Sequence, residues 1–581
     1  MLELNRNSSG KIFSVRFSNA ITSVLLDTNE QTWQPIQVKS EDDLPKHRVL
    51  FLDSAQQKHK EIPAQIFSLE DLEELHLEKN QIEAIPKEIC HLRNIRVLYL
   101  NNNDITQLCN ELGELQVLQS LDLSDNPLTC SSLAVISRLQ QLRELRLYNI
   151  QLTQFPVELC KKLHHLHLLG LANNKLQSLP LEVVNLIHLK ELYLQNNEFE
   201  LFPKQICTLP CLEIVDLDKN RLTSIPDEIS SLANLTKLFI SMNKLSSIPK
   251  TLGHCTRLAV LDVSGNHLRK LPHALDELKD LTELGLSNNV FKTLPSRISK
   301  LRSLCVLYLK NTGLTTLPAE FAKLEFLKIL DLSQNRFTEF PSEVCGLKRL
   351  QVLSLDDNLI SSITPQVISL QNLINLGITG NRFNAFPEEV SMLESLEKLY
   401  IGQDRGTRLA SLPENICLLK NLRELYIENN NLTSLPSTLH QLQKLTVLDC
   451  HNNHLNHLPD SVCQIPGLQK LLLHNNLLTT LPDNLDMLHS LDLLLLSGNP
   501  MTDPPEDVCS QGKTAVWACL KEKRHKSAMA TKIQALWRGI MVRKGLGPYI
   551  YLLQMGKKEK SKKDKKVKGK GKKCAAKGKK K

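Results

Sequence analysis

A unit of 23 residues, with apolar and polar side chains at fixed places, recurs along most of the chain. The unit reads LxxLxLxxNxLxxLPxxIxxLxx, and one copy runs through Leu235, Leu238, Ile240, Asn243 and Pro249. Its asparagine slot recurs at Asn80, Asn103, Asn126, Asn174, Asn197, Asn220, Asn243, Asn266, Asn289, Asn335, Asn358, Asn381, Asn430, Asn453, Asn476 and Asn499. A fixed period of this size predicts a repeat protein, in which each unit buries its apolar face only against its neighbours.

Each fixed place in the unit predicts a piece of structure. The LxLxx segment alternates with period two, which predicts one short strand per unit, stacked in parallel with its leucines pointing inward. An asparagine amide at the following corner supplies donors and an acceptor to buried backbone groups. The Leu-Pro step predicts an extended outer segment, because proline restricts its own backbone and that of the preceding residue. The pattern therefore predicts an α/β solenoid, a curved horseshoe with a parallel sheet on its concave side.

The pattern also divides the chain into segments. About 19 units of 23–24 residues occupy residues 72–509, and a degenerate unit at residues 48–71 is expected to cap their start. Residues 1–47 form an N-terminal extension that precedes the pattern. An insertion at residues 405–407 stretches one proline spacing to 26 residues. It marks either a boundary between two binding zones or a loop insertion of the kind that repeats tolerate.

These units, with their Leu-Pro step, resemble the intracellular leucine-rich-repeat family, in the 23-residue class found in Ras-pathway scaffolds and polarity proteins. The resemblance covers about three-quarters of the chain. It implies a protein-binding scaffold, although the fold serves many unrelated partners. No nucleophile, base and orienting group can be assembled from positions that the repeat leaves unexplained, so we expect no enzymatic activity, cofactor or metal site.

The side chain between the second and third leucines of each strand segment is expected to face outward on the concave side. A sheet of about 19 strands spaced ~4.8 Å apart extends roughly 90 Å, enough for a whole protein domain. Aromatic anchors interleaved with acids suit a basic protein ligand. The alternative is that these are ordinary strand residues facing water. The candidate positions are Tyr99, Asp122, Tyr193, Asp216, Phe239, Asp262, Tyr308, Asp331, Tyr400 and Tyr426.

Cysteine usage and the lack of long apolar runs bear on the compartment. The fifteen cysteines are spread through the repeats, and seven share one repeat position, which indicates reduced thiols acting as small hydrophobic side chains. No run of 18 apolar residues occurs, and the first thirty residues lack a basic start followed by an apolar core. We therefore expect a cytoplasmic protein with no transmembrane segment.

Two helices are expected after the repeats. In residues 510–527, Val516, Cys519 and Leu520 follow helical spacing, which predicts a helix that caps the last repeat. The helix expected at residues 528–548 matches the pattern IQxxxRGxxxRxxL at every defined position. The matching and flanking residues are Ile533, Gln534, Trp537, Arg538, Gly539, Met541, Arg543, Lys544 and Leu546.

This segment resembles the IQ motif of calmodulin-binding and myosin-neck proteins, and repeats followed by one IQ motif resemble the leucine-rich repeat and IQ domain-containing proteins. The resemblance implies that one lobe of calmodulin, or of a calmodulin-like light chain, grips Ile533 and Gln534. Gly539 would permit close approach, and Arg538 and Arg543 would pair with acidic side chains. The alternative is a basic amphipathic helix that lies on a membrane surface or on the solenoid.

Charge separates an acidic body from a basic end. Residues 557–581 carry a net charge of +13 and residues 521–548 carry +7, which leaves about −11 for the rest. The Lys-rich tail at residues 549–581 cannot bury a core and is expected to be disordered. It either makes weak, salt-sensitive contacts with anionic surfaces or is a solvated tail.

Taken together, these features predict a non-catalytic adaptor in intracellular signalling. An unidentified protein would bind the concave face, and calmodulin or a calmodulin-like protein would bind the IQ segment. The competing interpretation is a structural component of a ciliary or microtubule assembly that holds a calmodulin-like subunit constitutively.

Overall fold

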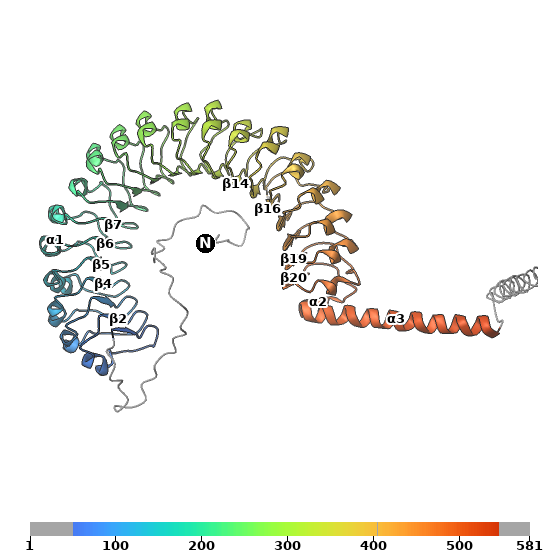
Figure 1. Ribbon diagram of the computed structural model, residues 1–581, viewed down its shortest axis with the longest axis horizontal. Helices are drawn as coiled ribbons and strands as arrows, with labels where there is room; N and C mark the ends of the chain where they lie inside the picture. Colours follow the sequence, from blue (N-terminus) through green and yellow to red (C-terminus); the bar gives the residue numbers. More distant parts are fainter. Residues whose placement is uncertain (1–49, 404, 545–581) are drawn as a thin grey trace, which may run out of the picture. The chain divides into compact units, whose positions relative to one another are not determined.

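The computed structural model describes residues 50–403 and 405–544, which form two compact units. The first unit comprises the chain up to Leu409 together with residues 418–422, and the second comprises residues 410–417 and the chain from Arg423 onward. The predicted N-terminal extension, the Lys-rich tail and Leu546 lie outside the described residues. In both units each repeat contributes one three-residue strand and, on the side of the repeat away from that strand, one short helix (Figure 1).

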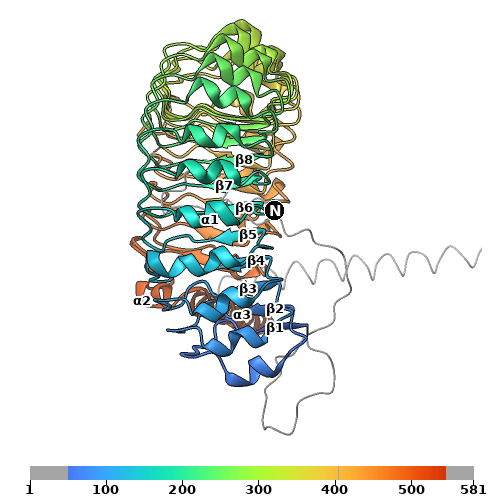
Figure 2. The same cartoon turned by 90° about the vertical axis from the view of Figure 1, so that its left-hand side faces the viewer.

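The first unit contains a parallel sheet in which every strand pairs with the next one along the chain. Leu238 lies opposite Leu261, for example, so each leucine stacks on its counterpart one repeat later. Figure 2 shows the early strands lying one above another, with helices along the outer side. The strands are β1 (Phe51–Asp53), β2 (Glu74–His76), β3 (Val97–Tyr99), β4 (Ser120–Asp122), β5 (Glu144–Arg146), β6 (Leu168–Gly170), β7 (Glu191–Tyr193), β8 (Ile214–Asp216), β9 (Lys237–Phe239), β10 (Val260–Asp262), β11 (Glu283–Gly285), β12 (Val306–Tyr308), β13 (Ile329–Asp331), β14 (Val352–Ser354), β15 (Asn375–Gly377) and β16 (Lys398–Tyr400).

The outer side differs from the extended segment that the Leu-Pro step predicts. Pro226 is extended, with φ −75° and ψ 155°, but the next five residues form a 3-10 turn that begins when the Ile229 amide donates to the Pro226 carbonyl at 3.2 Å. Proline favours this start because its fixed φ suits the residue before a helix and its missing N–H costs nothing there. The 3-10 helices are η1 (Ala64–Ser68), η2 (Lys87–His91), η3 (Asn110–Glu114), η4 (Cys130–Arg138), η5 (Leu181–Asn185), η6 (Lys204–Thr208), η7 (Asp227–Ser231), η8 (Lys250–His254), η9 (His273–Glu277), η10 (Ser296–Lys300), η11 (Ala319–Lys323), η12 (Ser342–Gly346), η13 (Pro365–Ser369), η14 (Glu388–Met392), η15 (Glu414–Leu418), η16 (Ser437–Gln441), η17 (Asp460–Gln464) and η18 (Leu485–Met487), with one α-helix, α1 (Val157–Lys162), in the same place.

Leucines and asparagines take the positions that the repeat predicts. The strand leucines, such as Leu238, are fully buried. The Asn266 amide nitrogen donates to the carbonyls of Ile240 and Val263, each at 2.9 Å, and its oxygen accepts from the Leu245 amide at 2.9 Å. Each asparagine therefore joins two consecutive repeats through backbone groups that would otherwise be buried without partners.

The second unit holds four further parallel strands and the C-terminal helices. The strands are β17 (Glu424–Tyr426), β18 (Val447–Asp449), β19 (Lys470–Leu472) and β20 (Leu493–Leu495), and the helices are α2 (Glu506–Ser510) and α3 (Lys513–Lys544). The two helices predicted at residues 510–527 and 528–548 are thus one continuous helix of 32 residues. In the described part of the chain, no helix combines the length and the apolar character needed to cross a bilayer.

Candidate protein-binding surfaces

The N-terminal half of α3 is fixed to the last repeat. Its Val516 and Leu520 side chains are buried, and Cys519 is half-buried. Lys523 forms ion pairs with Asp483 at 2.8 Å and Asp503 at 2.6 Å, and these two carboxylates raise the pKa of Lys523. Apolar burial and ion pairing therefore hold the same stretch of helix.

The next residue on α3 makes the most enclosed polar contact of this anchor. The Arg524 guanidinium pairs with Asp486, whose side chain is 1% exposed, and also donates to Asn484 at 3.2 Å. The second carboxylate oxygen of Asp486 has no partner among the described residues. Arg524 is therefore the counter-charge of a buried carboxylate.

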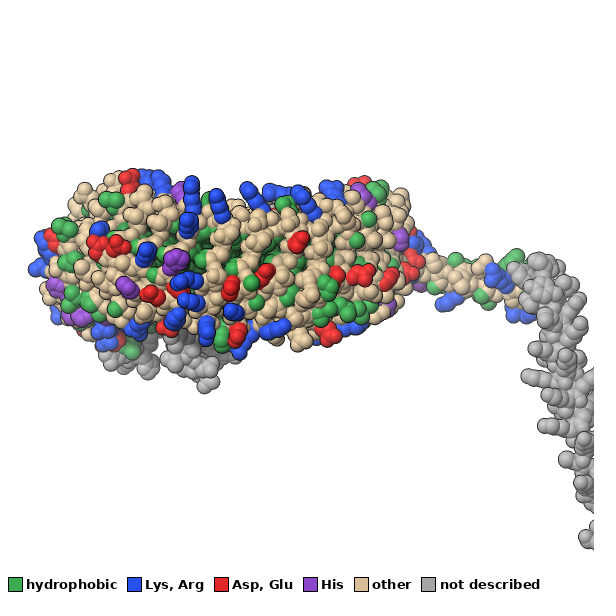
Figure 3. All heavy atoms as spheres, turned by 90° about the horizontal axis from the view of Figure 1, so that it is seen from above, with side chains coloured by type: hydrophobic (Ala, Val, Ile, Leu, Met, Phe, Trp, Pro, Cys, Tyr) green, Lys and Arg blue, Asp and Glu red, His purple; other side chains and the backbone are tan. Residues whose placement is uncertain are grey.

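The C-terminal half of α3 has no such support. Ile533 is 63% exposed, Leu536 64%, Trp537 52% and Ile540 43%, so an apolar stripe of four large side chains faces solvent. Hydrophobic and basic side chains stand next to each other on this part of the helix (Figure 3). The remaining described candidates divide into the exposed Gln534, Arg538, Arg543 and Lys544 and the half-buried Gly539 and Met541.

Two different faces of α3 serve the anchor and the stripe. Ile533 follows Leu520 by thirteen residues, and at about 100° per residue this turns the helix by roughly 220°. The stripe consequently points away from the side that packs on the last repeat. Near Gly539, a Cβ would have no neighbour closer than the Arg543 guanidinium at 3.6 Å, so the helix surface there is open.

The concave candidates are more enclosed than the sequence predicts. Tyr400, Tyr426, Asp216 and Asp331 are buried. The other six, Tyr99, Asp122, Tyr193, Phe239, Asp262 and Tyr308, are half-buried. Four of the ten candidates therefore expose little of their side chains, because strands packed at sheet spacing crowd the side chains of adjacent repeats.

The concave aspartates also have a structural role that the sequence analysis missed. Each accepts a hydrogen bond from the backbone amide two residues later: Asp122 from Ser124 at 2.9 Å, and Asp262 from Ser264 at 2.9 Å. Such bonds satisfy the backbone where the strand ends. Burial raises the pKa of Asp122. These carboxylates are therefore partly committed to the fold.

The concave aromatic side chains are held by neighbours on the same face. The Tyr193 hydroxyl donates to Glu191 at 2.7 Å, and the His76 and Tyr99 rings lie 4.7 Å apart. Burial, followed by the Glu191 hydrogen bond, raises the pKa of Tyr193. The positions of these rings are therefore defined by contacts within the fold.

Further carboxyl groups on the concave face were not among the sequence-based candidates. Burial and the charges of Asp216 and Asp262 raise the pKa of Asp218 to about 8. Burial and Asp262 likewise raise the pKa of Glu283 to about 7, and burial raises that of Asp356 to about 7. The candidates share the position between the second and third leucines of the strand segment. Asp218 and Asp356 lie two residues after this position, and Glu283 lies two residues before it. The available sequence signal was the close spacing of acids at Asp216 and Asp218 and at Asp356 and Asp357, whereas Glu283 has no acidic neighbour in the sequence.

Comparison with known proteins agrees with this architecture. A model described as "Leucine-rich repeat region" matches residues 24–161, 103–242, 182–285 and 298–399. Models described as "Leucine Rich repeats (2 copies)" and "Leucine rich repeat" match residues 420–460 and 443–501. The chain belongs to the leucine-rich-repeat family, whose scaffold is typically non-catalytic and serves in protein interaction.

Individual relatives match shorter or more distant stretches. The chain is 61% identical over 62 residues to mouse (Mus musculus) leucine-rich repeat and IQ domain-containing protein 4, and 50% identical over 52 residues to its human (Homo sapiens) counterpart. Those matches span 10% and 9% of this chain and the same shares of the two relatives. The chain therefore matches about a tenth of the length of these curated relatives.

Two solved structures match over most of the repeats. A leucine-rich-repeat protein of Leptospira interrogans is 33% identical, with a TM-score of 0.52, over 72% of this chain and 94% of that one. The plant peptide hormone receptor RGFR1, in complex with RGF2, is 25% identical, with a TM-score of 0.53, over 76% of this chain and 80% of that one. Both support the assignment of the fold.

Proposed function

We propose that this protein is a cytoplasmic signalling scaffold that holds calmodulin, or a calmodulin-like light chain, on the C-terminal half of α3. A second protein is held on the concave face of the repeats. The observation that carries the proposal is the exposed stripe of Ile533, Leu536, Trp537 and Ile540 on a helix that is already formed. A monomeric protein rarely leaves so many large apolar side chains side by side in water.

The chemistry around the stripe selects the kind of partner. Arg538, Arg543 and Lys544 surround it and are exposed, so a complementary surface would be acidic and would offer an apolar groove. Burying one such apolar side chain contributes ~1.5–3 kcal/mol. Calmodulin-like lobes have both properties, and the names of the mouse and human relatives include an IQ domain.

A paired substitution tests the IQ proposal. Ile533→Ala with Gln534→Ala should reduce calmodulin binding at least a hundredfold, measured by isothermal titration calorimetry on the full chain in calcium and in chelator. The matched control is Ser527→Ala with Thr531→Ala, two exposed residues of the same helix that lie close to the anchored side. The control should bind like the wild type. Failure of the wild-type chain to bind calmodulin in both conditions would reject the proposal.

The concave face supports the second part of the proposal. Asp262, Glu283 and Tyr308 are neighbours on β10, β11 and β12 and are only half-buried, so they offer an acidic and aromatic surface to a basic ligand. Asp262→Lys with Glu283→Lys should remove a set of copurifying proteins that the outer-face control, Glu88→Lys with Glu111→Lys, retains. An unchanged set would argue that Asp262 and Glu283 merely face water.

The Lys-rich segment motivates the competing function, a structural component of a ciliary or microtubule assembly. Its net charge of +13 at residues 557–581 would attract an acidic filament surface. Microtubule co-sedimentation of the full chain and of a chain ending at residue 555 distinguishes the two functions. A signalling scaffold should remain in the supernatant in both forms.

A further inference from the structure

One flank of the first unit, between the asparagine slot of each repeat and the following proline, carries basic side chains and no acidic ones over five successive repeats. The five flank segments at residues 220–226, 243–249, 266–272, 289–295 and 312–318 contain five Lys or Arg residues and no Asp or Glu. The basic residues are Arg221, Lys244, Arg269, Lys270 and Lys292, and His267 lies among them. Acidic residues reappear on this flank at Glu198 and Glu339, on either side of the run.

The flank segments of successive repeats are in register, so these side chains form a row. The amide of Lys244 donates to the Leu222 carbonyl at 2.9 Å, and that of His267 donates to the Leu245 carbonyl at 2.8 Å. The amide of Val290 continues the row by donating to the preceding repeat at 2.9 Å. Each step between repeats is therefore close to a strand spacing, ~4.8 Å.

The charged side chains from Lys244 to Lys292 in this row are available to a ligand. Lys244, His267, Arg269, Lys270 and Lys292 are all exposed, and none forms an ion pair with any residue that the structure describes. Arg221 differs, because it reaches Glu198 at 3.6 Å. Lys and Arg held this close repel one another, so an anionic partner would gain by neutralising them.

Two exposed apolar side chains accompany the row: Val290 lies in it, and Met242 directly precedes its second segment. Met242 is 49% exposed and Val290 is 61% exposed. The Met242 side chain lies against the turn of the next repeat, since a Cβ on Gly265 would be 3.1 Å from the Met242 Cγ. The surface is therefore basic with apolar side chains in it, rather than uniformly charged.

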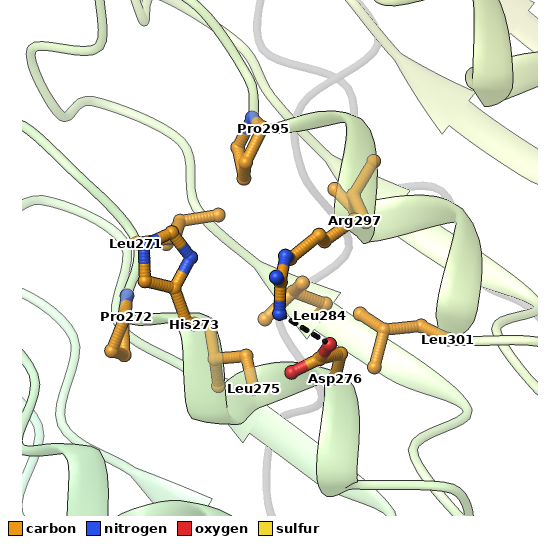
Figure 4. A pocket seen from close by; sticks show the side chains of 10 residues that line it. Leu271, Pro272, His273, Leu275, Asp276, Leu284, Pro295, Arg297 and Leu301 are labelled. Carbon is orange, nitrogen blue, oxygen red and sulfur yellow. Dashed lines mark hydrogen bonds and ion pairs between the residues drawn. The ribbon is translucent and has the colours of Figure 1, made fainter.

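The row ends beside a cleft between η9 and η10. His273 and Arg297 line this cleft with Pro272 and Pro295, and Arg297 reaches Asp276 at 3.4 Å (Figure 4). Asp276 also binds Lys300 at 2.9 Å, and these cationic partners lower its pKa. Asp276, the one acid among the residues that line this cleft, is thus already paired with two cations.

We propose that this flank, from Lys244 to Lys292, is a docking surface for an acidic, carboxylate-rich protein segment that also carries apolar side chains. An extended segment presents side chains on one face about every 7 Å, and the long, flexible Lys and Arg side chains of the row, with repeats ~4.8 Å apart, can reach its carboxylates. Single-stranded nucleic acid fits less well, because the flank offers no exposed aromatic ring for bases to stack on and Phe291 is buried. The flank shares no residue with the concave candidates or with α3.

Carbodiimide cross-linking of the full chain tests this surface directly, since it joins a peptide carboxylate to a lysine in contact with it. The probe is a 12-residue peptide of alternating Glu and Leu, and the cross-linked lysines are identified by mass spectrometry. Lys244, Lys270 and Lys292 should label at least fivefold more than the exposed lysines of the outer helices, Lys87, Lys250 and Lys323. Equal labelling of the two sets would overturn the proposal.

Charge reversal provides the second arm. Lys244→Glu, Arg269→Glu and Lys292→Glu together should abolish the excess at Lys270, whereas Lys87→Glu, Lys250→Glu and Lys323→Glu should leave it intact. All six side chains are exposed, so both triple variants are expected to fold. If oligothymidylate protects the flank lysines better than the peptide does, the site binds nucleic acid and the proposal is wrong. Loss of calmodulin binding would not alter the result, because the flank does not involve α3.

Discussion

Removing the Arg524 side chain should release α3 from the last repeat. Arg524→Ala leaves the Asp486 carboxylate, with its side chain 1% exposed, without its counter-charge. Breaking a fully buried ion pair costs ~3–5 kcal/mol. Because Arg524 itself is 26% exposed, water can reach the pair after the change, and we expect a smaller loss, about 2–3 kcal/mol.

The loss should be local and measurable by hydrogen exchange. Val516 and Leu520 still bury their side chains in the variant, but the helix opens more often. A cost of 2–3 kcal/mol corresponds to amide exchange about 30- to 150-fold faster over residues 513–526. Exchange in the first unit should stay unchanged, because repeat proteins transmit such changes mainly to neighbouring repeats.

Two further variants make the reasoning refutable. Lys526→Ala removes a cation whose one ion pair among the described residues is with Glu522 of the same helix, and it should leave exchange over residues 513–526 nearly unchanged. Arg524→Met combined with Asp486→Asn removes both charges and should restore most of the protection. If Arg524→Ala and Lys526→Ala accelerate exchange equally, the buried pair does not hold the helix. Calmodulin binding should change less than twofold in all three.

Three other predictions concern the repeats. Asn266→Ala should lower the free energy of unfolding in urea by about 3 kcal/mol, because the Leu245 amide and two carbonyls lose their buried partner; a loss below 1 kcal/mol would contradict this account. Burial raises the folded-state pKa of Asp218 to about 8, so the folded chain binds more protons than the unfolded one at neutral pH, and stability should rise as pH falls from 8 to 6. Asp218→Asn should flatten that rise in thermal melts. Maleimide should label the exposed Cys130 much faster than the buried Cys450, whose pKa burial raises; similar rates would refute the buried assignment.

The repeat itself was predictable in detail. Leucine spacing fixed the strand at Leu238, and the asparagine slot placed Asn266 correctly, because both positions depend on local geometry that recurs sixteen or more times. Even the degenerate first unit forms β1, paired in parallel with β2. A periodic sequence determines such contacts because each residue meets its own equivalent in the next repeat.

The concave face was less predictable. Period-two alternation predicts on which face of the sheet a side chain lies, but it does not predict which neighbouring residue that side chain covers. Asp262 leans over Gly285, where a Cβ would be 2.2 Å from its carboxylate oxygen. Tyr148 likewise covers Gly170. These contacts depend on a glycine in the following repeat, a relation between positions 22 or 23 residues apart that the consensus does not contain.

The continuity of α3 could have been inferred and was not. Between Lys513 and Lys544 there is no proline, and Gly539 is the only glycine. Ser527 and Thr531 belong to residue types that often start helices. The Thr531 hydroxyl instead donates to the Ser527 carbonyl at 2.9 Å within the helix. Such back-bonding allows threonine to remain inside a helix.

Because α3 is one unbroken helix, it also fixes the direction in which its exposed apolar stripe points relative to the last repeat. From Ser527 to Lys544 the free part of α3 extends ~27 Å, at 1.5 Å per residue. Inserting one alanine after Lys526 would turn a bound partner by about 100°, whereas inserting seven would restore the direction to within ~20° and move it ~10 Å outward. The number of residues in this part of the helix sets how far a bound partner lies from the last repeat. The fraction of a helical turn left after the last whole turn sets the direction in which the partner points.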